Sequence, residues 1–273
     1  MGAEAVAHLA SAIYGNASHA TLRAINVEGT MNAFHAPARA GVRRFVCPSS
    51  VAAYGFHADN PVGMTEDWPA RGSERLFYSG EKAEIERLLL QAAAEHPDIE
   101  VTLFRPTIVL GPHAVGAGED AIPGPLRLLA RGFAGLLGTF PVPFPAVPPP
   151  QPLQFVHEAD VGQAFHLALL GDGPPGIYNL TGDGTLTGQE VWREAALLPL
   201  PVPGRVIRAV AEAVMRVPGK PAAFEWAEAA TRPLVVDATR AKQRLGWRPA
   251  YTNLEAQRDT LLFPPSEGRP GVA

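Results

Sequence analysis

The sequence predicts an α/β fold, in which helices cover a doubly wound parallel sheet that carries a smaller C-terminal domain. Two neighbouring segments support this prediction. The run 42–48 is apolar apart from two arginines, which indicates a strand buried on both faces. The preceding segment, 19–40, has apolar residues at helical spacing and is followed by Gly41, a common C-terminal stop. A helix directly before a buried strand favours the right-handed crossover of a parallel sheet.

The alternation of strands and helices continues along the chain. We expect strands over 3–10, 101–104, 153–156 and 176–180, and helices over 78–96, 161–170, 188–197 and 205–217. The helix over 161–170 is expected to begin with Asp160 as its N-cap. Residues 54–77 are polar and contain Gly and Pro, which predicts a long functional loop. The prolines of 140–152 predict an extended segment that fits a lid or a linker equally.

The composition is that of a globular protein suited to small-molecule chemistry. Of the 273 residues 47% are hydrophobic and 18% charged, and the net charge is −4. Without a run of Lys or Arg, or an apolar run of membrane-spanning length, we expect neither a nucleic-acid partner nor a membrane. The single cysteine, Cys47, lies in the apolar strand, which favours a structural role and a reducing, cytoplasmic location. We predict no metal site.

Three residues have the chemistry of a proton-transfer site. Tyr78 and Lys82 are four residues apart, so on a helix they lie on one face. A phenol with a pKa of about 10 is a poor base at neutral pH, but an adjacent ammonium favours the phenolate. Ser50 follows the buried strand and could polarise the same substrate oxygen. The structural alternative is a surface Tyr and Lys that have this spacing by chance.

The order of the motifs is more specific than any one of them. The chain reads strand, Ser-Ser-Val-Ala-Ala-Tyr-Gly, loop, Tyr-Ser-Gly-Glu-Lys, strand, and Arg-Pro-Thr-Ile-Val-Leu-Gly-Pro. This order resembles the extended short-chain dehydrogenase/reductase family, which includes the NAD-dependent sugar epimerases and dehydratases, and 237–249 is similar to the family's C-terminal signature. The resemblance implies a truncated Rossmann-like core over 1–112 and 152–181. Residues 113–151 and 182–273 would form the substrate-side cap.

The resemblance also implies site residues and a cofactor, NAD or NADP. The catalytic residues would be Ser50, Tyr78, Lys82 and Asn26, with Lys82 holding the nicotinamide ribose and Asn26 supporting the proton relay. A solvated polar residue is the structural alternative for Asn26. The cofactor would be bound by Leu9, Ala10, Ser11, Asn26, Tyr78, Lys82 and Pro106.

The implied function is an NAD(P)-dependent epimerase or dehydratase that acts on a hydroxyl or keto substrate, such as a nucleotide sugar. Ile108 stands where sugar-nucleotide members often have an Asn that binds the substrate. Because isoleucine cannot donate a hydrogen bond, a dehydrogenase or reductase of a non-sugar alcohol or ketone stays open. Family members pair through the helices matching 19–40 and 78–96, which implies a homodimer.

The family's opening strand and its Gly-x-x-Gly-x-x-Gly loop have no counterpart near Met1. Either the written start lies inside a longer gene product, or the chain is a non-catalytic binding or regulatory protein that has lost its cofactor site. The intact strand over 3–10 favours the first interpretation. We expect these 273 residues to bind NAD or NADP weakly, because the glycine turn supplies the pyrophosphate anchor.

Overall fold

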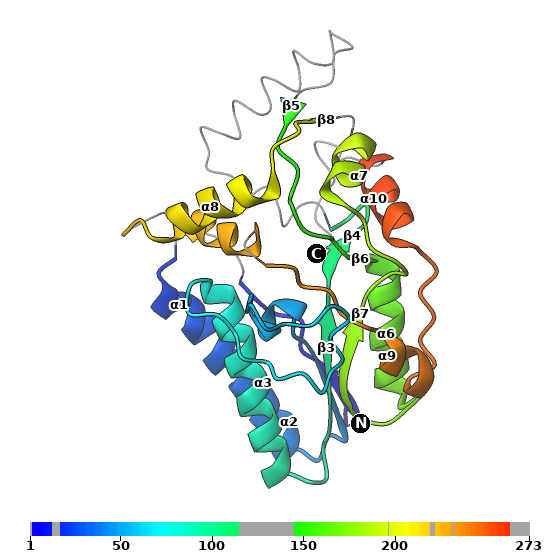
Figure 1. Ribbon diagram of the computed structural model, residues 1–273. Coiled ribbons are helices and arrows are strands. Elements are labelled where there is room, and N and C mark those ends of the chain that lie inside the picture. Colours follow the sequence, from blue (N-terminus) through cyan, green and yellow to red (C-terminus); the bar gives the residue numbers. More distant parts are fainter. Residues whose placement is uncertain are drawn as a thin grey trace, which may run out of the picture.

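The computed structural model describes residues 2–12, 17–114, 145–195, 197–218, 222–230 and 232–262. Within these residues a four-stranded parallel sheet has the order β1-β2-β3-β7 (Figure 1). Its strands are Ala5–Ala7, Arg44–Pro48, Glu100–Pro106 and Gly176–Leu180. The predicted α/β fold with a parallel sheet is confirmed.

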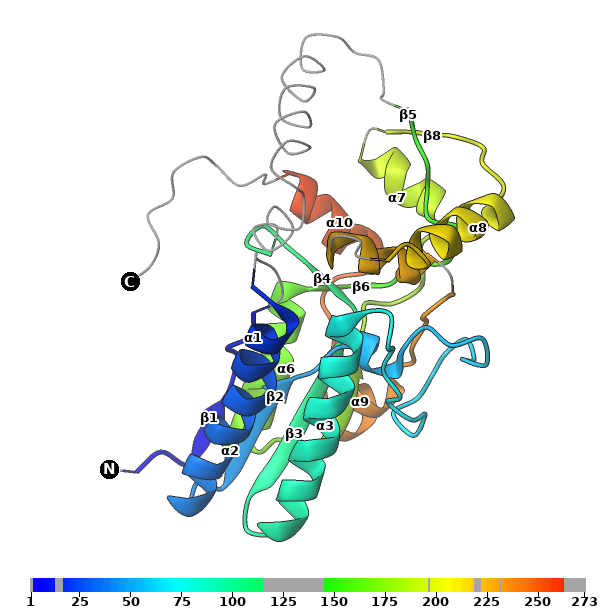
Figure 2. The same ribbon diagram turned by 90° about the vertical axis from the view of Figure 1, so that its left-hand side faces the viewer.

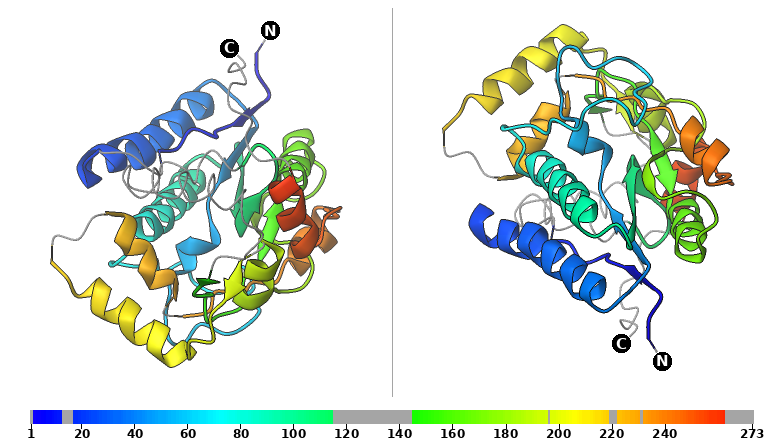
Figure 3. Two further views of the ribbon diagram at one scale, coloured as in Figure 1. Left: turned by 90° about the horizontal axis from the view of Figure 1, so that it is seen from above. Right: turned by 90° about the horizontal axis from the view of Figure 1, so that it is seen from below.

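Helices pack on both faces of this sheet. One face is covered by α1 (His19–Arg23), a π-helical turn η1 (Ala24–Glu28), α2 (Gly29–Arg39) and α3 (Phe77–Glu95). The other face is covered by α6 (Glu158–Leu170) and α9 (Thr239–Arg244), as the views in Figures 2 and 3 show. The predicted helix over 19–40 is therefore present with one wider turn, and Gly41 follows it with φ 75°.

Successive residues of β2 enter two different cores. Phe45 and Cys47 pack with Leu89 of α3, whereas Val46 packs with Phe165 of α6 and with Trp247. Both faces of the strand are therefore buried, which is why its sequence is a continuous apolar run instead of an alternation.

The start of α6 differs from the prediction. His157 is the N-cap, because its Nδ1 accepts a hydrogen bond from the Ala159 amide at 3.1 Å. Asp160 lies in the first turn and is buried, and it accepts hydrogen bonds from the amides of Ala250 (2.7 Å) and Tyr251 (3.2 Å). The prediction that Asp160 caps this helix is wrong. Its carboxylate instead binds the C-terminal segment at residues 250–251 to α6.

The chain leaves the main sheet after Pro106. There β4 (Ile108–Leu110) pairs with β6 (Phe155–His157), and β5 (Pro145–Ala146) pairs with β8 (Leu198–Pro199). These strands gather beyond the carboxyl ends of β2 and β3 with α7 (Gly188–Glu194), α8 (Gly204–Met215), the 3-10 helix η3 (Ala222–Ala230) and α10 (Asn253–Leu262) (Figure 1).

The predicted division into core and cap remains a prediction. Residues 115–144, which include the start of the predicted lid or linker and much of the first predicted cap segment, lie outside the described residues. In the part of the chain that the structure describes, no helix has the length and apolar character needed to cross a bilayer.

Candidate active site

Ser50, Tyr78 and Lys82 come together where α3 begins beside the carboxyl end of β2. Tyr78 is the second residue of α3, and the Nζ of Lys82, one turn later, lies 5.6 Å from the centre of the Tyr78 ring. Ser50 precedes the 3-10 turn η2 (Val51–Tyr54), and its hydroxyl is near enough to the Tyr78 phenol to lower that group's pKa. The helix spacing and the end of β2 thus bring these three side chains into one site. Their catalytic roles stay predictions.

Lys82 is a buried cation with spare hydrogen-bonding capacity. The residue is 6% exposed, and its Nζ donates to the Pro48 carbonyl at 3.1 Å. Burial lowers the pKa of Lys82, while the charges of Glu81 and Glu86 act in the opposite direction. An ammonium has three N–H donors, so two remain for a ligand once the Pro48 carbonyl is bound. Vicinal hydroxyls, such as those of a ribose, fit these donors.

The environment of the Tyr78 phenol differs from the prediction. Burial raises the pKa of Tyr78 and the charge of Glu81 raises it further, whereas hydrogen bonding with Ser50 lowers it. Trp226 of η3 covers the ring, with the two ring centres 5.5 Å apart. Burial dominates at the phenol, so the Tyr78 pKa is raised and the expected lowering by the Lys82 charge is not found. The phenol keeps its proton at neutral pH.

Asn26 is buried inside the π-helical turn η1, which excludes the alternative of a solvated polar residue. Its Nδ2 donates to the Ala12 carbonyl (2.8 Å) and to Glu81 Oε2 (3.0 Å). Its Oδ1 accepts from the Ala12 amide (2.7 Å) and from Ser11 Oγ (3.4 Å). One side chain therefore holds the segment that follows β1 against α3. A π-helical turn is frequent at functional sites because it redirects such a side chain.

The remaining predicted cofactor residues lie at the ends of β1 and β3, the two strands that flank β2. Leu9, Ala10 and Ser11 follow β1 and are exposed, Leu9 to 63%. Pro106 is buried as the last residue of β3, where it pairs in register with Leu180. The carboxyl ends of parallel strands meet at one edge of a sheet, which is where such folds bind ligands. Contact of these four residues with a cofactor remains a prediction.

A buried ion pair beneath the site had not been predicted. Arg105 of β3 donates to the Glu86 carboxylate from Nε (2.9 Å) and from Nη2 (2.5 Å), and both side chains are at most 3% exposed. Ser49 also donates to Glu86. The sequence signal was available, because Glu86 lies four residues after Lys82 on the same helix face and Arg105 lies in an apolar strand.

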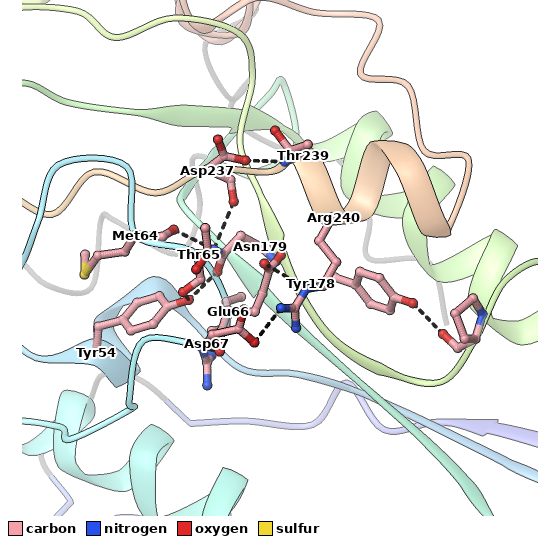
Figure 4. A network of polar contacts seen from close by, with 12 residues as sticks. Tyr54, Met64, Thr65, Glu66, Asp67, Tyr178, Asn179, Asp237, Thr239 and Arg240 are labelled. Carbon is pink, nitrogen blue, oxygen red and sulfur yellow. Dashed lines mark hydrogen bonds and ion pairs between the residues drawn. The ribbon is translucent and has the colours of Figure 1, made fainter.

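The long loop before α3 is fastened to β7 through Asn179, as Figure 4 shows. The Tyr54 hydroxyl donates to Asn179 Oδ1 (2.8 Å), and the Asn179 amide donates to Glu66 Oε1 (2.8 Å). Asn179 Nδ2 donates to the carbonyls of Met64 (3.1 Å) and Asp237 (3.0 Å). These bonds fix the loop that leads into Tyr78.

Cys47 is buried at the other side of the site, near the Lys82 ammonium. Burial raises the pKa of Cys47 to about 12, so the thiol is neutral at physiological pH. This agrees with the structural role expected for it.

Comparisons with known proteins show the fold and the family of the chain. An uncharacterised protein of Mycobacterium tuberculosis is 29% identical over 263 residues, and the match spans 93% of this chain but only 64% of that protein's length. Pseudomonas aeruginosa RMD, solved in complex with NADPH, has a similar fold with a TM-score of 0.68 and 20% identity, covering 95% of this chain and 81% of that one.

A second solved structure is similar to the same extent. The UDP-glucose 4-epimerase of Thermotoga maritima, solved with UDP-glucose, has a TM-score of 0.68 and 19% identity, covering 95% of this chain and 76% of that one. The family model described as NAD dependent epimerase/dehydratase family matches residues 1–181. Because this match covers more than half of the 273 residues, the chain belongs to the NAD dependent epimerase/dehydratase family.

Proposed function

We propose that the protein is an NAD(P)-dependent oxidoreductase of the epimerase or dehydratase type, in which Tyr78 exchanges a proton with a substrate oxygen. The observation that carries the proposal is the meeting of Ser50, Tyr78 and the buried Lys82 at the carboxyl edge of the sheet. Relatives of this fold that have been solved with NADPH or with UDP-glucose support the proposal.

The residues present fit a nicotinamide cofactor on its ribose side. The two unused donors of Lys82 suit ribose hydroxyls, and Leu9, Ala10 and Ser11 offer an exposed strand end beside them. When bound, NAD or NADP supplies the hydride donor or acceptor of the reaction. Asn26 keeps this strand end in place by holding both the amide and the carbonyl of Ala12.

The chain's own residues handle the proton. Ser50 donates a hydrogen bond to the substrate oxygen, and the protonated Tyr78 gives its proton to the same oxygen when that oxygen gains charge. The positive charge of Lys82 stabilises the phenolate that remains. In the reverse direction the phenolate takes the proton back. Trp226 covers the ring and limits the access of water from the side of η3.

Two substrate classes fit the site. A nucleotide sugar agrees with the solved relative that holds UDP-glucose. One observation favours a non-sugar alcohol or ketone, because Ile108 is 52% exposed just after the end of β3 and has no hydrogen-bonding group. On either alternative, α7, α8, η3 and α10 form the substrate-side cap beyond the carboxyl ends of the strands.

Tyr78→Phe tests the proposed function, because it removes only the phenolic oxygen. The complete gene product is assayed with NAD⁺ and NADP⁺ against a panel of UDP-sugars, dTDP-sugars and secondary alcohols, with absorbance at the nicotinamide band as the readout. We expect kcat to fall by about 10² to 10⁴, the usual contribution of a general acid or base. Tyr251→Phe is the matched control, since the Tyr251 ring stacks on His157 away from Lys82. A near-normal kcat in Tyr78→Phe would refute the assignment.

We also propose a homodimer that forms through the helices over 19–40 and 78–96. Two large apolar side chains on these helices are exposed, Ile25 to 49% and Leu90 to 45%. Such exposed apolar groups suit a helix–helix contact. Sedimentation velocity on the purified protein should give a dimer for the parent and a monomer for Leu90→Glu, while Leu170→Glu, at an exposed leucine of α6 on the opposite face of the sheet, serves as the control. A parent that sediments as a monomer would contradict the proposal.

A further inference from the structure

Glu81 is a buried acidic group that the mechanism above does not use. It directly precedes Lys82 and is 5% exposed. Its Oε2 accepts the hydrogen bond from Asn26 at 3.0 Å, whereas its Oε1 is buried and has no hydrogen-bond partner within the described residues. An unsatisfied buried polar atom costs about 1 to 3 kcal/mol. A buried polar atom without a protein partner calls for an explanation, and a role in the neighbouring site is one.

The other carboxylates on this part of α3 are already matched by cations. Glu86 is bound by Arg105, and Glu84 is bound by Arg23 at 2.5 Å. In the described part of the chain no ion pair involves Glu81. Lys82 directly follows Glu81 and has no ion pair within the described residues, and of the cationic groups that lower the Glu81 pKa it acts most strongly.

The surroundings of Glu81 come from two helices. The titratable and charged groups that face it are His19 and Arg23 of α1, and Tyr78, Lys82 and Glu84 of α3. Burial raises the pKa of Glu81, while Asn26 and then Lys82 lower it. Burial lowers the pKa of Lys82, whereas the charges of Cys47 as a thiolate, Glu81 and Glu86 raise it, and His8 also lies within electrostatic reach of Lys82.

We propose that Glu81 is a further positioning residue of this site: held by Asn26, it supplies the negative charge that keeps the buried Lys82 ammonium protonated. The inference rests on the proposed function, because only a cationic Lys82 stabilises a Tyr78 phenolate. The charge relation itself needs neither cofactor nor substrate. It can therefore be measured on the chain directly.

The titration of Lys82 tests the proposal. The sequence contains three lysines, Lys82, Lys220 and Lys242, so Lys220→Arg and Lys242→Arg assign the side-chain ¹³Cε and ¹⁵Nζ resonances. We expect Glu81→Gln, which still accepts the Asn26 hydrogen bond, to move the Lys82 titration to lower pH. At a fixed pH below the midpoint, the neutral fraction should rise roughly three- to tenfold.

Glu84→Gln is the matched control, because it removes a carboxylate from the same helix that Arg23 already neutralises. It should leave the Lys82 titration in place. An unchanged titration in folded Glu81→Gln, or an equal shift in Glu84→Gln, would overturn the proposal.

If Glu81→Gln does not fold, the titration of Lys82 in the parent chain tests the proposal instead. Its Lys82 resonances should then show a second inflection, above the usual range of a carboxyl group, as Glu81 takes up its proton. A single inflection would overturn the proposal. Because no turnover is measured, this outcome is separate from that of Tyr78→Phe: an active Tyr78→Phe enzyme removes the proposed function and leaves the charge relation standing.

Discussion

Two consecutive turns of α3 carry buried charges on the same face and are paired very differently. At Glu86 the carboxylate receives hydrogen bonds from Arg105 Nε and Nη2 and from Ser49, and Arg105 also lies 4.4 Å from the centre of the Tyr54 ring. One turn earlier, Lys82 binds a single carbonyl, that of Pro48, among the residues that the structure describes. The turn at Glu86 has its hydrogen-bonding groups paired, and we call it the saturated turn. The turn at Lys82 has N–H donors left for a ligand, and we call it the unsaturated turn.

The difference shows how one helix can be fixed in the fold by one turn and present site residues from the next. The saturated turn joins α3 to β3 and to the end of β2, which fixes where the helix lies. The unsaturated turn would then present Lys82 and Tyr78 at a set distance from Ser50, with hydrogen-bonding groups left for a ligand. Buried polar groups without full pairing are costly, so their retention beside a saturated pair indicates use.

Glu86→Ala should break the saturated turn, and it has the largest expected effect on stability. Removing the carboxylate leaves the Arg105 guanidinium charged and buried, which costs about 3 to 5 kcal/mol in the free energy of unfolding. Urea unfolding followed by circular dichroism measures this loss.

A surface pair on the same helix gives the matched control. Glu84→Ala removes the partner of the half-exposed Arg23, and exposed pairs contribute about 0 to 1 kcal/mol. The double variant Glu86→Met/Arg105→Met should recover most of the loss, because no charge is left without its partner. If Glu86→Ala lowers the free energy of unfolding no more than Glu84→Ala does, the buried pairing at Glu86 does not set its turn apart from the Lys82 turn.

The parts of the fold that were predictable from the sequence depend on local signals. The apolar run of β2 and the helical periodicity over 19–40 each lie in one segment, and the structure has both. The predicted site depends on the spacing within α3 and on Ser50 at the end of β2, so these residues meet as the sequence indicated.

The parts that were not predictable depend on contacts between distant segments. The π-helical turn at Asn26 accompanies bonds to Ala12 on one side and Glu81 on the other. The Tyr78 pKa is raised in a setting where Trp226 covers the ring from a segment far along the chain. Local sequence gives no sign of either contact. The prediction that Asp160 is the N-cap of α6 was wrong for a similar reason, because the Asp160 carboxylate accepts hydrogen bonds from the distant C-terminal segment.

Lys82→Met sharpens the comparison at the unsaturated turn, where the expected effect on stability is small. Methionine has a similar length and no charge, so the variant loses one hydrogen bond to Pro48 and also removes a buried ammonium that lacks an ion pair within the described residues. At neutral pH its free energy of unfolding should equal or slightly exceed that of the parent, although turnover should be lost with the cation.

The pH dependence of the free energy of unfolding should also differ between the parent and Lys82→Met. Burial lowers the pKa of Lys82 below 10.5, so in the window between these two values the unfolded chain binds more protons than the folded chain. The parent's free energy of unfolding should therefore rise with pH across that window, and this rise should be missing in Lys82→Met. Lys242→Met, which removes a lysine paired with Asp183 at the surface, should keep it. Urea unfolding in steps between neutral and alkaline pH measures all three. A loss in Lys82→Met as large as that in Glu86→Ala would show that the turn beside Tyr78 is held by pairing after all.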